Sequence, residues 1–150
     1  MTEAADHAAI HRVKYKYGQV IDRLVREGPG AVADELRDVF TDDISLDLRD
    51  IEGMPHMRGI EEVVAYFRDG MPVFVEWMWH AFYNPIIDIS GDTATGEWLL
   101  LAFSRGKDAP DAPPAGSMGR YLERYVRTPD GWRAREVTFR LGSRFRTLPY

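Results

Sequence analysis

The sequence predicts an α+β fold in which helices come first and an antiparallel sheet follows. Up to about residue 70 the apolar residues recur mostly with helical spacing, whereas from residue 73 onward strand-like segments follow one another. Turn sequences such as Ser90-Gly91-Asp92 and Thr128-Pro129-Asp130-Gly131 divide these segments. Helices and strands that are segregated rather than alternating favour an antiparallel sheet over a doubly wound parallel one.

Three helices are expected in the first half. The first spans the first 28 residues, ends at Gly28-Pro29-Gly30, and carries one apolar face made of Ile10, Val13, Tyr17, Val20, Ile21 and Leu24. A shorter second helix has Val32, Leu36, Val39 and Phe40 on one side. After a turn at residues 41–43, a strand over 44–48 and a second turn at Gly53 and Pro55, a third helix carries Ile60, Val63, Val64 and Phe67.

The second half predicts four strands. Residues 73–89 are aromatic and β-branched, and they need a bend or bulge near Asn84-Pro85 to remain in a sheet. Residues 94–103 return antiparallel after a tight turn. A proline-rich loop over 107–116 precedes two further strands over 118–127 and 132–141.

Composition limits the function classes. A chain of 150 residues with 45% hydrophobic and 29% charged residues is one ordinary globular domain, residues 1–150. The net charge of −5 offers no basic surface for nucleic acid, and no apolar run approaches the roughly 20 residues that span a bilayer. The absence of cysteine excludes disulfides, thiolate nucleophiles and iron–sulfur clusters. Because the N-terminus lacks a signal-peptide pattern, we expect a cytoplasmic protein.

Most motifs that carry chemistry are absent. The sequence has no glycine-rich phosphate loop, no Gly-x-Ser-x-Gly elbow and no His-Glu-x-x-His pair. His7 and His11 are four residues apart in the first predicted helix, but no third ligand is evident, so we expect no metal. His56, in a predicted turn, is expected to be a surface residue.

His80 is the candidate for chemistry, because it lies inside the long aromatic strand. It is either a core histidine whose ring nitrogens are hydrogen-bonded or a general base, since imidazole titrates near neutral pH. A base works best when a carboxylate fixes its tautomer, and Asp22 is the candidate carboxylate. At roughly 100° per residue, Asp22 lies about 150° from the apolar stripe of its helix, which by itself predicts a solvated charge. A helix packed on two sides would bury it.

The order of these elements resembles the nuclear-transport-factor-2-like superfamily, and its SnoaL-like and scytalone-dehydratase-like branch in particular. The segments that carry the resemblance are spread over nearly the whole chain: Tyr17-x4-Asp22, Phe40-Thr41-Asp42-Asp43, Arg58-Gly59-Ile60-Glu61-Glu62-Val63, His80-x3-Asn84-Pro85-Ile86-Ile87-Asp88-Ile89-Ser90-Gly91-Asp92-Thr93-Ala94 and Tyr125-Val126-Arg127-Thr128-Pro129-Asp130-Gly131-Trp132-Arg133.

The resemblance implies a cone, in which a curved sheet and the helices enclose a deep apolar pocket. It also implies that His80 is a base paired with Asp22, as in dehydratases and dehydrochlorinases of this group, and that Tyr17 faces the substrate. A second active-site histidine of scytalone dehydratase falls on Trp98, which cannot shuttle protons, and a substrate-binding asparagine falls on Tyr121. We expect Tyr17, Trp98, Tyr121, Asn84 and Phe139 to line the substrate pocket.

Three functions remain open on these grounds. The first is a cofactor-independent lyase or isomerase of the dehydratase type, acting on a small, mostly apolar cyclic or polyketide-like substrate. The second is an aldol cyclase for polyketide-like chains that uses the same residues. The third is a non-catalytic binding module or oxygenase-type subunit, in which His80 is only structural. The resemblance and the aromatic density of residues 73–103 also predict a homodimer or higher homo-oligomer, joined through the outer face of the sheet.

Overall fold

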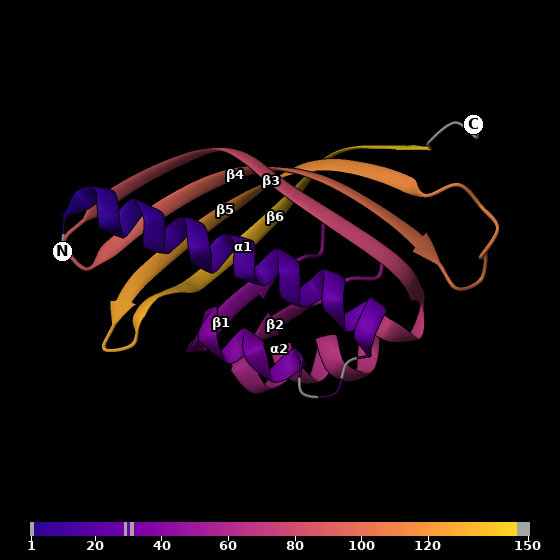
Figure 1. Ribbon diagram of the computed structural model, residues 1–150, viewed down its shortest axis with the longest axis horizontal. Coiled ribbons are helices and arrows are strands. Elements are labelled where there is room, and N and C mark those ends of the chain that lie inside the picture. The colour runs from indigo at the N-terminus through magenta and orange to yellow at the C-terminus, as the bar shows by residue number, and fades with distance from the viewer. Residues whose placement is uncertain (1, 29, 31, 147–150) are drawn as a thin grey trace.

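A single long helix lies against one face of a six-stranded, curved sheet in the computed structural model, which describes residues 2–28, 30 and 32–146 (Figure 1). The α-helices are α1 (Glu3–Glu27) and α2 (Ile60–Ala65), and the short helical segments are η1 (Ala33–Asp38), η2 (Tyr66–Gly70) and η3 (Met71–Val73). The strands are β1 (Phe40–Asp47), β2 (His56–Arg58), β3 (Val75–Ser90), β4 (Thr93–Gly106), β5 (Ala115–Thr128) and β6 (Gly131–Arg146). This arrangement confirms the predicted α+β class.

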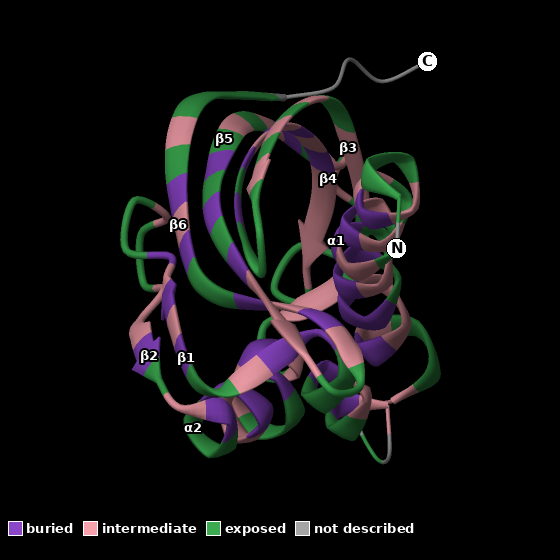
Figure 2. Cartoon of the chain, turned by 90° about the vertical axis from the view of Figure 1, so that its left-hand side faces the viewer, coloured by how far each residue is buried: buried purple, intermediate pink, exposed green. Residues whose placement is uncertain are grey.

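The sheet has the strand order β2-β1-β6-β5-β4-β3 and does not close on itself (Figure 2). Strands β3 to β6 form an antiparallel meander, as predicted. The pairing of β1 with β6 is parallel, however, with Leu46 opposite Val137. No hairpin joins these two strands, so their relative direction is not imposed by a tight turn.

The helical half differs locally from the prediction. The second helix is a 3-10 helix that ends at Asp38, and Phe40 begins β1 instead of belonging to the helix. The expected turn at residues 41–43 lies inside β1, where the register with β6 is irregular between Phe40 and Ser45. The backbone N–H of Ala134 donates to the carbonyl of Val39 over 2.9 Å, so the chain already bonds to β6 at Val39.

The predicted bend of β3 is confirmed at Asn84. This residue has a positive φ of 47°, and the register with β4 shifts between Tyr83 and Ile86. A bulge of this kind increases strand curvature, which the sheet needs to wrap around α1.

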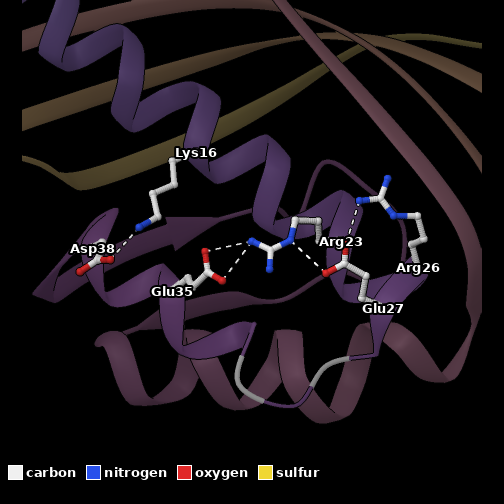
Figure 3. A network of polar contacts seen from close by, with 6 residues as sticks. All are labelled: Lys16, Arg23, Arg26, Glu27, Glu35 and Asp38. Carbon is white, nitrogen blue, oxygen red and sulfur yellow. Dashed lines mark hydrogen bonds and ion pairs between the residues drawn. The ribbon is translucent and has the colours of Figure 1, made fainter.

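Helix α1 is held on two sides. Towards the sheet, its buried residues include Ile10, Tyr17 and Leu24. On the other side, ion pairs connect it to η1: Lys16 contacts Asp38 over 2.6 Å, and Arg23 contacts Glu35 over 3.0 Å (Figure 3). The helix is therefore held by the sheet on one side and by η1 on another, while residues such as Gln19 and Arg26 stay exposed.

Within the described chain, no helix combines the length and the apolar character that crossing a membrane requires.

Candidate functional site

His80 and Asp22 meet where α1 crosses β3. The Nδ1 atom of His80 lies 2.6 Å from Oδ1 of Asp22, and the backbone N–H of His80 donates to Oδ2 over 3.1 Å. Both carboxylate oxygens of Asp22 are therefore engaged by a single residue. The side chains are 8% and 18% exposed, so the pair is largely removed from water.

The contact with Asp22 determines which nitrogen of His80 is available. A carboxylate accepts, so Nδ1 carries the hydrogen and Nε2 holds the free lone pair in the neutral ring. Nε2 has no hydrogen-bond partner among the described residues. Nε2 is also not fully buried. Among the described residues, the one fully buried side-chain nitrogen or oxygen without a hydrogen-bond partner is Oγ1 of Thr41. The ring of Phe82 stacks on the imidazole, with centroids 5.9 Å apart and planes inclined by 14°.

A cavity of about 290 Å³ adjoins His80. Its lining is mostly apolar and rich in methionine, with few polar side chains: Ile51, Glu52, Met54, Met71, Phe74, Val75, Met78, His80, Leu100, Ala102, Ser104, Ala115, Gly116, Ser117, Tyr121, Leu141 and Arg144. The strand register explains the space, because small residues occupy β4 and β5 beside His80. Ala102 lies opposite His80, and Ser117 lies opposite Ala102. An apolar cavity with a few polar groups is the usual form of a small-molecule site.

A larger groove of about 550 Å³ runs along the outside of the molecule between α1 and β3. It touches Asp22, Arg23 and Trp77 but does not reach the imidazole ring of His80. The smaller cavity is therefore the candidate site.

Two of the predicted pocket residues are buried tyrosines that contact Phe82, the ring that stacks on His80. Tyr121 lines the cavity, and Tyr17 lies behind it, with ring centroids 6.1 Å apart. Burial raises the pKa of both hydroxyls, which keeps them protonated and able to donate hydrogen bonds. Tyr17 itself is not among the residues that line the cavity.

The other three predicted pocket residues lie away from the cavity. Trp98 is fully buried under the N-terminal half of α1, where its Nε1 donates to the hydroxyl of Tyr125 over 3.0 Å. Phe139 is buried against the ring of Tyr121, with centroids 5.0 Å apart. Asn84 is exposed at the bulge of β3. The structure thus brings His80, Asp22 and Tyr121 together, with Tyr17 in support.

Lys14 is the central residue that sequence reasoning missed. Its side chain is 1% exposed, and its Nζ pairs with Oε1 of Glu123 over 2.5 Å. The hydroxyl of Tyr125 donates to the other oxygen of Glu123. Burial lowers the pKa of Lys14 to about 8, while the charge of Glu123 acts in the opposite direction.

The ammonium group of Lys14 also supports the wall of the candidate site. It lies 3.5 Å from the ring centroid of Tyr121 and 4.2 Å from that of Phe82, the ring that stacks on His80. These are cation–π distances. Nothing in the local sequence indicates this role, because a lysine in an amphipathic helix is typical of the solvated face.

The long helix packs against a curved, open sheet, and a largely buried His–Asp pair lies at an apolar cavity. This arrangement places the protein in the class of cone-shaped α+β proteins. The family described as the SnoaL-like domain matches residues 2–138, and the chain belongs to this family. No curated protein matches it in sequence.

Solved structures agree with this assignment. The protein Kfla4162 from Kribbella flavida is 25% identical, with a TM-score of 0.80 over 96% of this chain and 95% of its own. The hexachlorocyclohexane dehydrochlorinase LinA-type3 from Novosphingobium barchaimii LL02 is 16% identical, with a TM-score of 0.76 over 96% and 91%. An NTF2-like protein with a cystatin-like fold from Novosphingobium aromaticivorans is 18% identical, with a TM-score of 0.65 over 92% and 82%. At 16% and 18% identity, the last two similarities show a shared fold only.

Proposed function

We propose that this protein is a cofactor-independent lyase or isomerase in which His80 is the general base and Asp22 positions it. The observation that carries the proposal is the 2.6 Å contact between Nδ1 of His80 and Asp22, together with the unpartnered Nε2 beside the cavity. A general base needs a free lone pair, a fixed tautomer and a nearby charge that stabilises its protonated form. The pair supplies all three.

The proposed reaction begins with proton transfer from a substrate carbon to Nε2 of His80. The electron pair of the broken C–H bond then forms a carbon–carbon double bond. In a lyase reaction a leaving group departs from the neighbouring carbon with its bonding electron pair. In an isomerase reaction the neighbouring carbon belongs to an existing double bond, whose electron pair shifts onto a conjugated carbonyl oxygen, and the proton then returns to a different carbon. The anionic charge of Asp22 stabilises the imidazolium in either case.

Tyr121 is the residue that we assign to the developing negative charge on the substrate. Its side chain lines the same cavity as His80, and burial keeps its hydroxyl protonated. A protonated hydroxyl in an apolar cavity can donate to an oxyanion or to a departing anion.

The substrate class follows from the lining. A cavity of about 290 Å³ with Leu100, Leu141 and three methionines suits a small, mostly apolar cyclic or aromatic molecule. The dehydrochlorinase among the structural neighbours shares the fold, and its name denotes elimination from a chlorinated cyclohexane. An elimination of this general type is consistent with one histidine base and no metal.

The test uses 5-nitrobenzisoxazole, a flat aromatic probe whose ring opens when a base removes a single carbon-bound proton. We expect the wild-type protein to open the ring faster than free imidazole at the same concentration. A folded His80→Ala variant should lose about two orders of magnitude or more in rate. The His56→Ala variant is the control, because His56 forms a hydrogen bond with Ser45 and is not among the residues that line the cavity.

Two results would contradict the proposal. One is a wild-type protein no faster than free imidazole, which would favour a binding module. The other is a folded His80→Ala variant that keeps the wild-type rate.

A further inference from the structure

The cavity has a second polar region, on the side opposite His80. In the sheet register, His80 pairs with Ala102, Ala102 with Ser117, and Ser117 with Arg144, so these four residues form one row across β3, β4, β5 and β6. Residues directly opposite each other on neighbouring strands point to the same face of a sheet. All four accordingly line the same cavity, with the base at one end of the row and a guanidinium at the other.

The polar side chains at the far end of this row have no partners of their own. Neither Arg144 nor Ser117 makes a side-chain hydrogen bond or an ion pair within the described chain, and the same is true of Ser104 in the adjacent row. Most other arginines of the described chain are paired with a carboxylate, for example Arg37 with Glu61 and Arg135 with Asp43. The guanidinium of Arg144 is therefore available for a ligand.

The chemistry of this region favours an anion. A guanidinium carries only donors, and the serine hydroxyls can donate as well. Such a set matches a carboxylate, which accepts two parallel hydrogen bonds from arginine. The one carboxylate among the cavity-lining residues, Glu52, lies in the segment between β1 and β2 and is exposed to water, so its repulsion is screened.

We propose that Arg144 and Ser117 bind a carboxylate group of the substrate, whose apolar body extends along the row to His80. The proposal rests on the proposed function, because it takes His80 as the reacting end. It narrows the substrate class to small cyclic or aromatic acids.

The row also sets the length of this substrate. Three strand spacings of about 4.8 Å separate the Cα atoms of His80 and Arg144 by roughly 14 Å along the sheet. Side chains stand roughly perpendicular to a sheet, and both of these rise from the same face, so a substrate that reaches both must be long enough to extend over β4 and β5.

The test measures binding of trans-cinnamate and of its neutral analogue trans-cinnamamide by isothermal titration calorimetry. Charge-assisted hydrogen bonds to arginine predict that the wild-type protein binds the carboxylate about tenfold more tightly than the amide. Arg144→Gln should bring this ratio to about one while leaving amide binding unchanged. The matched control is Arg124→Gln, which removes the same charge from an exposed β5 residue outside the cavity lining.

Three outcomes would overturn the proposal: equal binding of the two compounds by the wild-type protein, a preference for the carboxylate that survives in Arg144→Gln, or no binding of trans-cinnamate at millimolar concentration. The same titration in the His80→Ala variant separates this proposal from the catalytic one. There the carboxylate preference should persist although proton abstraction is lost. A wild-type protein that has base activity but shows no carboxylate preference would overturn the anion site alone.

Discussion

Gly18 of α1 lies so close to Phe82 of β3 that a Cβ atom on Gly18 would be 2.6 Å from Cε2 of the ring. Gly18 is one helical turn before Asp22, and the same Cβ would lie 3.7 Å from Cβ of His80. The missing side chain thus allows the helix to approach the strand at the point where Asp22 reaches His80.

The Gly18→Ala variant should be destabilised and should lose base activity. Overpacking costs about 1–3 kcal/mol, which outweighs the roughly 1 kcal/mol that alanine gains over glycine in a helix. Urea denaturation and the rate of 5-nitrobenzisoxazole opening check this expectation. The exposed neighbour Gln19 provides the control variant Gln19→Ala. A Gly18→Ala protein that is more stable and fully active would show that the close approach is not required.

For the buried pair of Lys14 and Glu123, we expect a single variant to be less stable than the double variant. Lys14→Met removes the cation and leaves Glu123 without its charge partner, which should lower the free energy of unfolding by about 3–5 kcal/mol. Adding Glu123→Gln removes the unpaired charge and should restore part of this loss. Denaturant titrations of both variants measure the difference, and a double variant less stable than Lys14→Met would contradict the account.

We expect the protein to lose stability in acid when Asp6 is protonated. The guanidinium of Arg127 and the indole N–H of Trp132 hold the pKa of Asp6 well below its usual range. Because the unfolded chain then binds a proton more readily than the folded one, the stabilisation is complete above about pH 4 and is lost as the pH falls further.

The measurement for Asp6 is the free energy of unfolding between pH 6 and pH 3. Asp6→Asn should lower stability at pH 6 and flatten its fall at lower pH, whereas Asp111→Asn, in the exposed loop after β4, should leave the profile unchanged. An unaltered acid profile in Asp6→Asn would rule out this contribution.

The outer face of the sheet predicts self-association. Trp77, Trp79, Met118 and Phe145 are exposed there, and ring contacts join Trp79 to Phe103 and Phe103 to Phe145. Apolar surface of this kind commonly marks an interface. The rim carries both signs of charge, as in the pair of Arg120 and Glu97, which suits a second copy of the same chain.

Sedimentation equilibrium tests this association. The wild-type protein should be a dimer or a higher oligomer, and Trp79→Lys should shift it towards the monomer. A wild-type chain that stays monomeric at high concentration would contradict the prediction.

The period of the apolar residues was sufficient to predict the class of fold, because a helix and a half-buried strand impose different spacings on the same kinds of residue. It could not predict the parallel pairing of β1 with β6, since that contact joins residues such as Leu46 and Val137 that are far apart in the chain. The extension of β6 beyond Leu141 was also missed. Residues after Leu141 do not alternate, and pairing with β5 keeps them in the sheet.

The candidate site was only partly accessible from the sequence. His80 was recognisable because a histidine in an aromatic strand needs a partner. The partial burial of Asp22 depends on β3 crossing α1 at His80, a contact between distant parts of the chain that a helical projection does not contain. Arg144 and Lys14 gave no signal, because a charged residue in a strand or helix is usually solvated.

The most direct test of the central claim is the rate of proton abstraction by the Asp22→Asn variant. Asparagine has nearly the same shape as aspartate, but it carries no charge and offers one acceptor where His80 now uses two oxygens. By analogy with catalytic triads, we expect the rate of 5-nitrobenzisoxazole opening to fall by about two to four orders of magnitude in a folded protein. A folded Asp22→Asn variant with the wild-type rate would show that Asp22 does not assist a base at position 80.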